Sequence, residues 1–155
     1  MSLAAVRSLV EARLQFLETV APLYVFRPLL NADELRAWMR ECKFPVSVPD
    51  MHVTIVYSNS PMSWTVVPPQ RNTLRVPGGL RRIEVFGEGA TVLAFASRVL
   101  QDRWQQFMDA GASFDHDSYR PHVTLTYEDA SAVLHTKPFT GDLYFGPEVY
   151  EAVDP

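Results

Sequence analysis

Two short stretches of this chain carry the same reactive side chains in the same order. Residues 52–57 read His-Val-Thr-Ile-Val-Tyr, and residues 122–127 read His-Val-Thr-Leu-Thr-Tyr. Four of the six positions are identical, and two of the chain's four histidines head the two stretches. Imidazole can give or take a proton near neutral pH, and a threonine hydroxyl can donate a hydrogen bond to an oxyanion. The repeat therefore predicts acid–base chemistry.

Both stretches are rich in β-branched and aromatic residues, so each is predicted to be a strand. Side chains alternate between the two faces of a strand, which places the histidines and threonines together on one face. That face carries His52, Thr54, His122, Thr124 and Thr126. The intervening residues, up to and including Tyr57 and Tyr127, are predicted to pack on a core. If the two strands are neighbours, the imidazoles can flank one small anionic group, an arrangement that suits cleavage of a phosphodiester.

Composition and charge restrict the class of protein. The chain has 155 residues, 47% hydrophobic and 21% charged, which predicts one globular domain over residues 1–155. The single Cys42 excludes an internal disulfide and a cysteine-rich metal site, and favours a cytoplasmic location. A net charge of −4 argues against a long nucleic-acid partner but is compatible with a small phosphorylated ligand. No apolar run is long enough to span a bilayer, and Arg7 interrupts the N-terminal stretch in a way that is not typical of a signal peptide.

Hydrophobic periodicity and turn residues predict the elements that position the two repeats. Helices are expected at 3–18, from Asn31 or Asp33 to before Pro45, and around 99–108. Strands are expected at 23–27, 52–57, 72–76, 81–86, 90–96, 122–127, near 140–144 and near 149–152. Residues 58–70 are predicted to be an irregular connection and residues 113–119 a polar loop. The second half echoes the first, and the fold class is α+β with mostly antiparallel strands, preceded by an additional N-terminal helix within residues 1–20.

The paired motifs on an α+β chain of this size resemble the 2H phosphoesterase superfamily, which includes bacterial 2′–5′ RNA ligase-like proteins and cyclic phosphodiesterases. Residues 23–31, 51–54, 111–115 and 119–127 are similar to its phage-encoded branch, the anti-CBASS phosphodiesterases. Those proteins degrade the cyclic oligonucleotide signals of bacterial immunity. The similarity covers roughly residues 22–155 and implies a bilobal fold, with pseudo-two-fold lobes flanking a central cleft and helices on the outside.

The resemblance implies roles for two groups of residues. The catalytic group is His52, Thr54, His122 and Thr124, and which histidine is acid and which is base stays open. The substrate-binding group is Tyr24, stacking on a base, Arg27, contacting phosphate, and Glu148 and Glu151, accepting hydrogen bonds from a base. Without the resemblance, Tyr24 is equally a packing residue of its strand, and both glutamates are solvated acids.

The function implied is a metal-independent phosphodiesterase that cleaves 3′–5′ bonds of cyclic di- or trinucleotides, as a phage countermeasure in the host cytoplasm. No cofactor, membrane or long nucleic acid is expected. Alternative functions are an enzyme acting on 2′,3′-cyclic phosphates at RNA ends, a non-catalytic cyclic-nucleotide sponge, and a structural module of phage or host. Alternative roles for the histidines are purely structural ones, or a zinc site built with His116, Asp115 or Asp117.

Overall fold

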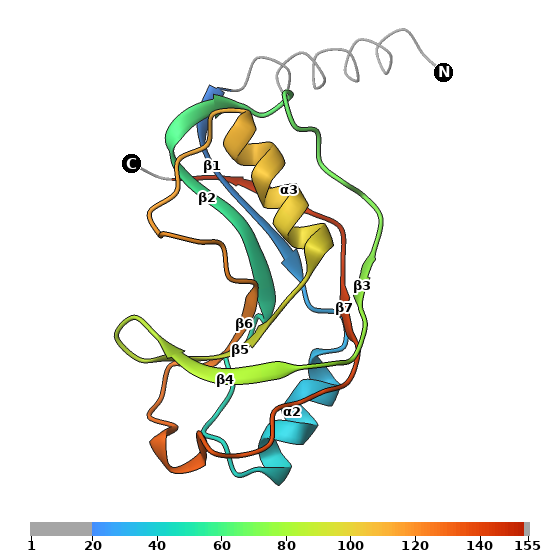
Figure 1. Cartoon of the computed structure of the whole chain (residues 1–155), viewed down its shortest axis with the longest axis vertical. Helices are drawn as coiled ribbons and strands as arrows, with labels where there is room; N and C mark the ends of the chain where they lie inside the picture. Colours follow the sequence, from blue (N-terminus) through green and yellow to red (C-terminus); the bar gives the residue numbers. More distant parts are fainter. Residues whose placement is uncertain (1–19, 154–155) are drawn as a thin grey trace, which may run out of the picture.

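The computed structural model describes residues 20–153, and the helix predicted at residues 3–18 lies outside them. Within the described range the chain combines strands with two α-helices and one short 3-10 helix (Figure 1). The elements are β1 (Val20–Pro28), α2 (Ala32–Glu41), β2 (His52–Ser63), β3 (Leu74–Val76), β4 (Arg81–Phe86), β5 (Ala90–Phe95), α3 (Arg98–Asp109), β6 (His122–Thr126), η1 (Ser131–Val133), β7 (Leu143–Phe145) and β8 (Val149–Ala152). None of the helices in this range is long and apolar enough to cross a membrane.

Six strands form one sheet in the order β4-β5-β6-β2-β1-β8, and every neighbouring pair is antiparallel. A second, two-stranded sheet pairs β3 with β7. The expected α+β class with mostly antiparallel strands is therefore confirmed. The two histidine strands, β2 and β6, are central, and within residues 20–153 their ladder contains the single pair Val53–Val123. The sheet consequently has two halves, β4-β5-β6 and β2-β1-β8, which meet at this pair.

The predicted internal echo is also confirmed. In the first half β1 leads through α2 to β2, and β1 pairs with β2. In the second half β5 leads through α3 to β6, and β5 pairs with β6. One further strand completes each half, β8 beside β1 and β4 beside β5. From either edge of the sheet, the completing strand comes first, then the strand that precedes the helix, then the histidine strand. The histidine strands therefore occupy equivalent places in the two halves.

A β-bulge interrupts each histidine strand three residues after its histidine. Ile55 lacks a partner between the pairs Phe26–Thr54 and Val25–Val56. Leu125 lacks a partner in the same way, because Thr124 pairs with Val92 and Thr126 with Thr91. An extra residue in one strand reverses which face the following side chains take. The repeat in sequence is therefore also a repeat of local backbone geometry.

The bulges overturn three predicted side-chain orientations. Tyr57 and Tyr127, expected on the core face, line the same cavity as the histidines and are 47% and 72% exposed. Thr126, expected beside the histidines, is fully buried, and its Oγ1 donates to the carbonyl of Val46 at 2.9 Å. Strict alternation predicts the faces correctly as far as Thr54 and Thr124 and fails after the bulge. A bulge depends on the neighbouring strand, which the local pattern does not contain.

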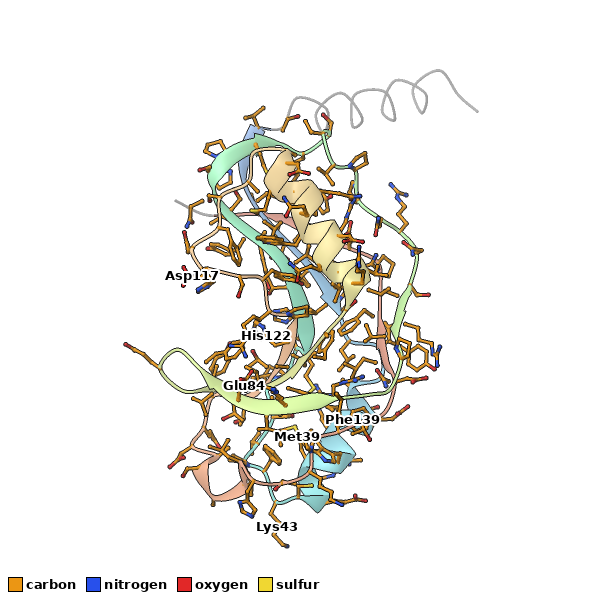
Figure 2. All side chains as sticks on the ribbon, viewed as in Figure 1. Met39, Lys43, Glu84, Asp117, His122 and Phe139 are labelled. Atoms are coloured by element: carbon orange, nitrogen blue, oxygen red, sulfur yellow. The ribbon has the colours of Figure 1, made fainter. Side chains whose placement is uncertain are left out.

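A single hydrophobic core joins the two halves, and both α-helices contribute to it. The buried residues of α2 are Leu35 and Met39, and α3 buries Leu100 and Phe107. The helices lie at opposite ends of the long axis of the molecule (Figure 1), and in Figure 2 Met39 marks the end that carries α2. α3 begins at a Ser97 cap, whose hydroxyl accepts from the amide of Leu100.

One connection and one helix cap differ from those predicted. The irregular segment expected from residue 58 is wrong over residues 58–63, because β2 continues to Ser63 and pairs with the long β1. A register irregularity between Ala21 and Leu23 leaves the partner chain around Pro61 unpaired, which accommodates a residue that has no amide donor. Asn31 does stand at the start of α2 but makes no capping bond. Its side chain donates to the carbonyl of Asp142 instead and accepts from the amide of Tyr144.

Candidate active site

A cavity of about 920 Å³ lies over the junction of β2 and β6 and contains both histidine–threonine pairs. The Val53–Val123 pair fixes the register: in an antiparallel ladder it sets His52 opposite Thr124 and Thr54 opposite His122. All four side chains project from the face opposite to the buried valines. The two histidines are diagonal neighbours, for which Cα atoms lie about 7–8 Å apart. That spacing leaves room for one small anionic group between the imidazoles. The structure thus brings together the four residues predicted to be catalytic.

The two imidazoles are held in the same way. Nδ1 of His52 lies 2.9 Å from the carbonyl oxygen of Asp50, and Nδ1 of His122 lies 2.7 Å from that of Arg120. A carbonyl oxygen can only accept, so each Nδ1 carries a proton and donates it. The Nε2 atoms are therefore the ones available for proton transfer. Each histidine is oriented by backbone two residues earlier, a local geometry that the sequence repeat reproduces on both sides.

Tyr24, on β1, breaks the symmetry between the histidines. Its hydroxyl lies 2.9 Å from Nε2 of His52 and 3.3 Å from Oγ1 of Thr54. Burial raises the pKa of the Tyr24 phenol, and the hydrogen bond with Thr54 only partly opposes that rise, so the phenol stays protonated. Within residues 20–153 no comparable hydroxyl contacts Nε2 of His122. The structure therefore places Tyr24 in the cavity, where its hydroxyl contacts His52 and Thr54 in addition to any contact that its ring makes with a ligand.

The electrostatic surroundings of His122 favour its neutral form. Burial lowers the pKa of His122 below the ordinary value of 6.5, and the charges of His52, Arg120 and His116 lower it further. The hydrogen bond to the Arg120 carbonyl opposes these effects. At neutral pH the imidazole of His122 is consequently unprotonated at Nε2 and able to accept a proton.

Aromatic rings border the cavity on both sides. Phe86 lines the cavity and meets the His122 ring edge-on, with the ring centroids 4.7 Å apart. Phe26 packs edge-on against the His52 ring, with the centroids 5.3 Å apart, but does not itself line the cavity. Tyr57 and Tyr127, turned inward by the two bulges, add exposed rings at equivalent positions of the repeat. Exposed aromatic faces are the groups on which nucleic-acid bases stack. The rings of Phe86, Tyr57 and Tyr127 were not predicted, although the last two are identical positions of the repeat.

The loop before β6 forms a further wall of the cavity. It contributes Phe114, Asp115, His116, Asp117, Ser118, Tyr119 and Arg120. Ser113 ties the loop to β2, because its Oγ accepts from the amides of Asn59 at 2.8 Å and Ser60 at 3.2 Å. The Tyr119 hydroxyl donates to the carbonyl of Thr54 at 2.7 Å. A polar loop was predicted here, but only proximity in the fold identifies it as part of the site.

The zinc alternative finds no support in this wall. No group of three or more histidine, cysteine, aspartate or glutamate side chains is placed to hold a metal ion within the part of the chain that the structure describes. His116 instead meets the ring of Phe114 edge-on at 5.5 Å, and Asp115 accepts from the side-chain amide of Asn59 at 3.1 Å.

Arg27 does not reach the cavity, and its predicted contact with phosphate is corrected. The side chain is 2% exposed. Its guanidinium donates to the carbonyls of Asn72 and Gly146 at 2.7 and 2.9 Å and to the side chain of Gln70 at 3.0 Å. Arg27 therefore binds the connections next to β3 and β7 to the sheet, a structural role that depends on partners distant in sequence.

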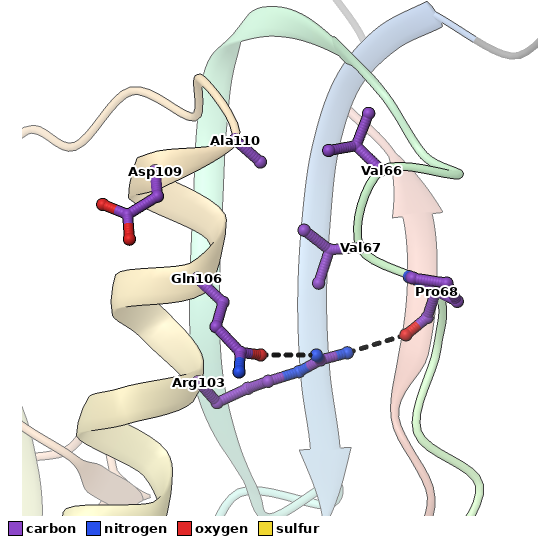
Figure 3. A pocket seen from close by; sticks show the side chains of 7 residues that line it. All are labelled: Val66, Val67, Pro68, Arg103, Gln106, Asp109 and Ala110. Atoms are coloured by element: carbon purple, nitrogen blue, oxygen red, sulfur yellow. Dashed lines mark hydrogen bonds between the residues drawn. The ribbon is translucent and has the colours of Figure 1, made fainter.

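Glu148 is likewise buried away from the cavity, which corrects its predicted contact with a base. Its carboxylate accepts hydrogen bonds from Nη2 of Arg103 at 2.7 Å and from Nε of Arg103 at 2.8 Å. It also accepts one from the backbone amide of Gln70 at 2.7 Å. Figure 3 shows Arg103 extending from α3 toward Pro68, whose carbonyl it contacts at 2.8 Å. Arg103 thus lines the hollow drawn in Figure 3, and its ion pair with Glu148 ties α3 to the residue just before β8.

Glu151 is the one predicted glutamate that lies beside the site. It is exposed, and it pairs with Tyr24 across β1 and β8, so the two side chains share a face of the sheet. Its charge contributes to the raised pKa of Tyr24. The position is compatible with a contact to a ligand that rests on Tyr24, and this role stays a prediction.

Comparison with known proteins gives one consistent result. A sequence model of the family described as "Anti-CBASS protein Acb1" matches residues 21–155. The chain is 43% identical over 142 residues to the protein of that name from Caulobacter sp. (strain RHG1), an overlap of 86% of this chain and 23% of the relative. It is 43% identical over 144 residues to that of Sphingomonas paeninsulae, with 85% and 23% covered. It is 36% identical over 117 residues to that of Escherichia phage RB16, with 71% and 65% covered. The chain thus spans about a quarter of the two bacterial relatives.

Proposed function

Because the chain belongs to the Acb1 anti-CBASS protein family, we propose that it is a 2H-type phosphodiesterase that cleaves 3′–5′ bonds of cyclic di- or trinucleotides. Destroying such a signal would make it a phage countermeasure against CBASS immunity, in keeping with the names of its relatives. The observation that carries the proposal is the Val53–Val123 pair, which sets two imidazoles and two hydroxyls around one point of a cavity. A pair of acid–base groups on either side of a phosphate is what in-line cleavage requires.

The proposed reaction assigns different tasks to the two histidines. The neutral His122 accepts the proton of a ribose 2′-OH through Nε2, as the 2′ oxygen forms a bond to phosphorus. The bond between phosphorus and the 5′ oxygen breaks, and protonated His52 gives its Nε2 proton to that oxygen. The product is a linear nucleotide ending in a 2′,3′-cyclic phosphate. The lowered pKa of His122 supports its role as base, and the Tyr24 hydroxyl at Nε2 of His52 supports the distinct role of the other histidine.

Negative charge on the non-bridging oxygens has donors in the same place. Thr54 and Thr124 stand opposite His122 and His52 in the ladder, so a phosphate between the imidazoles also meets both hydroxyls. Removing one such donor from an oxyanion site typically costs about 10²–10³ in kcat. No step of the proposed reaction uses a metal ion.

The test is incubation with 3′,3′-linked cyclic dinucleotides in excess EDTA, followed by chromatography. Wild type is compared with His52→Ala, His122→Ala and the matched control His135→Ala, which alters an exposed histidine that does not line the cavity. We expect linear product from wild type and from the control, and none from the other two variants. Cleavage that disappears with EDTA, or that survives in His52→Ala or His122→Ala, would refute the mechanism.

An RNA substrate, ligand recovery and melting curves, added to this assay, separate the alternative functions. An enzyme for RNA ends would leave the cyclic dinucleotide intact and open a 2′,3′-cyclic phosphate on RNA. A sponge would bind the cyclic dinucleotide tightly and release it unchanged after heating. A structural module would show no rise in melting temperature with any nucleotide.

A further inference from the structure

The cavity holds one permanent positive charge. Among the lining residues within the described range 20–153, Arg120 is the only arginine or lysine. The histidines of the site exchange their protons, whereas a guanidinium stays charged at every working pH. Two carboxylates of the loop wall, Asp115 and Asp117, repel an anion from their side. An anionic group that enters the cavity without lying between the imidazoles is therefore attracted to Arg120.

Arg120 is held in place but still accessible. It forms an ion pair with Glu84 on β4, and its guanidinium lies 4.8 Å from the centroid of the Phe86 ring. Half of the side chain remains exposed. In Figure 2, Glu84 and Asp117 are labelled on either side of His122. A guanidinium has five N–H donors, and the ion pair with one carboxylate leaves several of them for a ligand.

The repeat shows that the charge of Arg120 is not needed to build the site. Asp50 occupies the equivalent place in the first half, two residues before His52, and its carbonyl holds Nδ1 of that histidine in the same way. The backbone carbonyls of Asp50 and Arg120 orient the two histidines in the same way, but the side chain of Asp50 is acidic and that of Arg120 is basic. Asp50 does not line the cavity, whereas Arg120 does. The side chain of Arg120 is thus not needed to hold His122, and its exposed N–H groups can serve a ligand.

We propose that Arg120 binds the second, non-scissile phosphate of a cyclic oligonucleotide while the phosphate to be cleaved lies between His52 and His122. The inference rests on the proposed function and adds the group that recognises the ring. A cyclic dinucleotide always carries two phosphodiesters, and the planar fork of arginine matches two oxygens of a phosphate. A nucleoside 2′,3′-cyclic monophosphate has only one phosphate and can occupy the histidines without Arg120.

The experiment measures steady-state cleavage of a cyclic dinucleotide and of a nucleoside 2′,3′-cyclic monophosphate by wild type, Arg120→Gln and Arg120→Lys. Working at about pH 8 keeps His122 neutral in every variant. Binding of the cyclic dinucleotide is measured separately by calorimetry with each change in a His52→Ala background. The matched control is Arg98→Gln, which removes an exposed arginine that pairs with Asp102 on α3, outside the cavity.

We expect Arg120→Gln to raise KM and Kd for the cyclic dinucleotide at least about tenfold, with kcat within about threefold, the loss typical of one charge-assisted contact. Arg120→Lys should recover part of the affinity, and Arg98→Gln should change nothing. Glu84→Gln should not weaken binding, because it removes a competing carboxylate. Cleavage of the cyclic monophosphate, where it is observed, should be unaffected by Arg120→Gln.

Four outcomes overturn the inference. The first is an affinity for the cyclic dinucleotide that stays within about twofold of wild type in Arg120→Gln. The second is a fall in kcat while KM and Kd hold, which would mean that Arg120 acts through His122. The third is an equal loss in the cleavage of the cyclic monophosphate, which would place Arg120 at the scissile phosphate. Finally, wild type can neither cleave nor bind the cyclic dinucleotide, and in that case the proposed function fails as well.

Discussion

Replacing Glu148 with glutamine tests whether this residue supports the fold or the ligand. The carboxylate is fully buried, and its partner Arg103 is 9% exposed, with Nη2–Oε1 at 2.7 Å. Glu148→Gln keeps the volume but turns an amide N–H₂ group toward a guanidinium that has no other carboxylate within the described residues. The charge of Arg103 is then buried without compensation.

The expected loss follows from the burial of the pair. Removing one partner of a buried ion pair costs about 3–5 kcal/mol, because the remaining charge stays desolvated. For a chain of this size, about 1 kcal/mol corresponds to roughly 2–4 °C of melting temperature. Glu148→Gln should therefore lower the melting temperature by about 6–20 °C. Replacing both partners, as in Arg103→Met with Glu148→Leu, should recover part of that loss, because no buried charge is left.

The assay is thermal unfolding followed by circular dichroism, together with the affinity for a cyclic dinucleotide below the melting temperature. The control is Glu151→Gln, whose exposed carboxylate should change the free energy of unfolding by no more than about 0.5 kcal/mol. The reasoning is refuted if Glu148→Gln melts like wild type but binds the nucleotide less tightly. Glu148 would then contact the ligand directly, as the family resemblance implied.

Four further changes have expected outcomes. Tyr24→Phe removes the hydroxyl 2.9 Å from Nε2 of His52 and keeps the ring; we expect a loss of about 5–100-fold in kcat/KM from one or two hydrogen bonds, whereas an unchanged rate would leave only a stacking role. The proposed mechanism needs a neutral His122, whose pKa lies below 6.5, so the acid limb of the pH profile of kcat/KM should have its midpoint below 6.5; a midpoint above 6.5 contradicts its assignment as base. Thr126→Val should lower the free energy of unfolding by about 1–3 kcal/mol without changing the rate, since its buried hydroxyl donates to the Val46 carbonyl. Thr124→Val should lower the rate without changing the free energy of unfolding. Melting curves and kcat, measured on the same preparations, check both threonines.

The main features of the site were predictable because they are local. Alternation along an extended strand is set within a few residues, so His52 and Thr54 share a face whatever lies beyond. The same holds for His122 and Thr124. Strand and turn residues also predicted β4 over residues 81–86, since its hairpin is closed by a local turn.

The errors all lie where a distant strand or helix intervenes. The bulges at Ile55 and Leu125 depend on the register with β1 and β5, and they turn Tyr57 and Tyr127 into the cavity. The sequence does not decide between a ligand contact and a buried structural role for Arg27, because a basic residue on an aromatic strand is compatible with both. Its partners include Gly146, far along the chain, and only folding brings that carbonyl within 2.9 Å.

The sequence by itself determined which residues can do chemistry and that they come in two equivalent sets. Tertiary structure decided how the sets differ. The hydroxyl of Tyr24 reaches one histidine through the pairing of β1 with β2, and the guanidinium of Arg120 is held beside the other by Glu84 on β4. Such distances between groups tens of residues apart depend on sheet register and on the packing of the core. A repeated motif therefore predicts two imidazoles, and the fold around them gives the two imidazoles different surroundings.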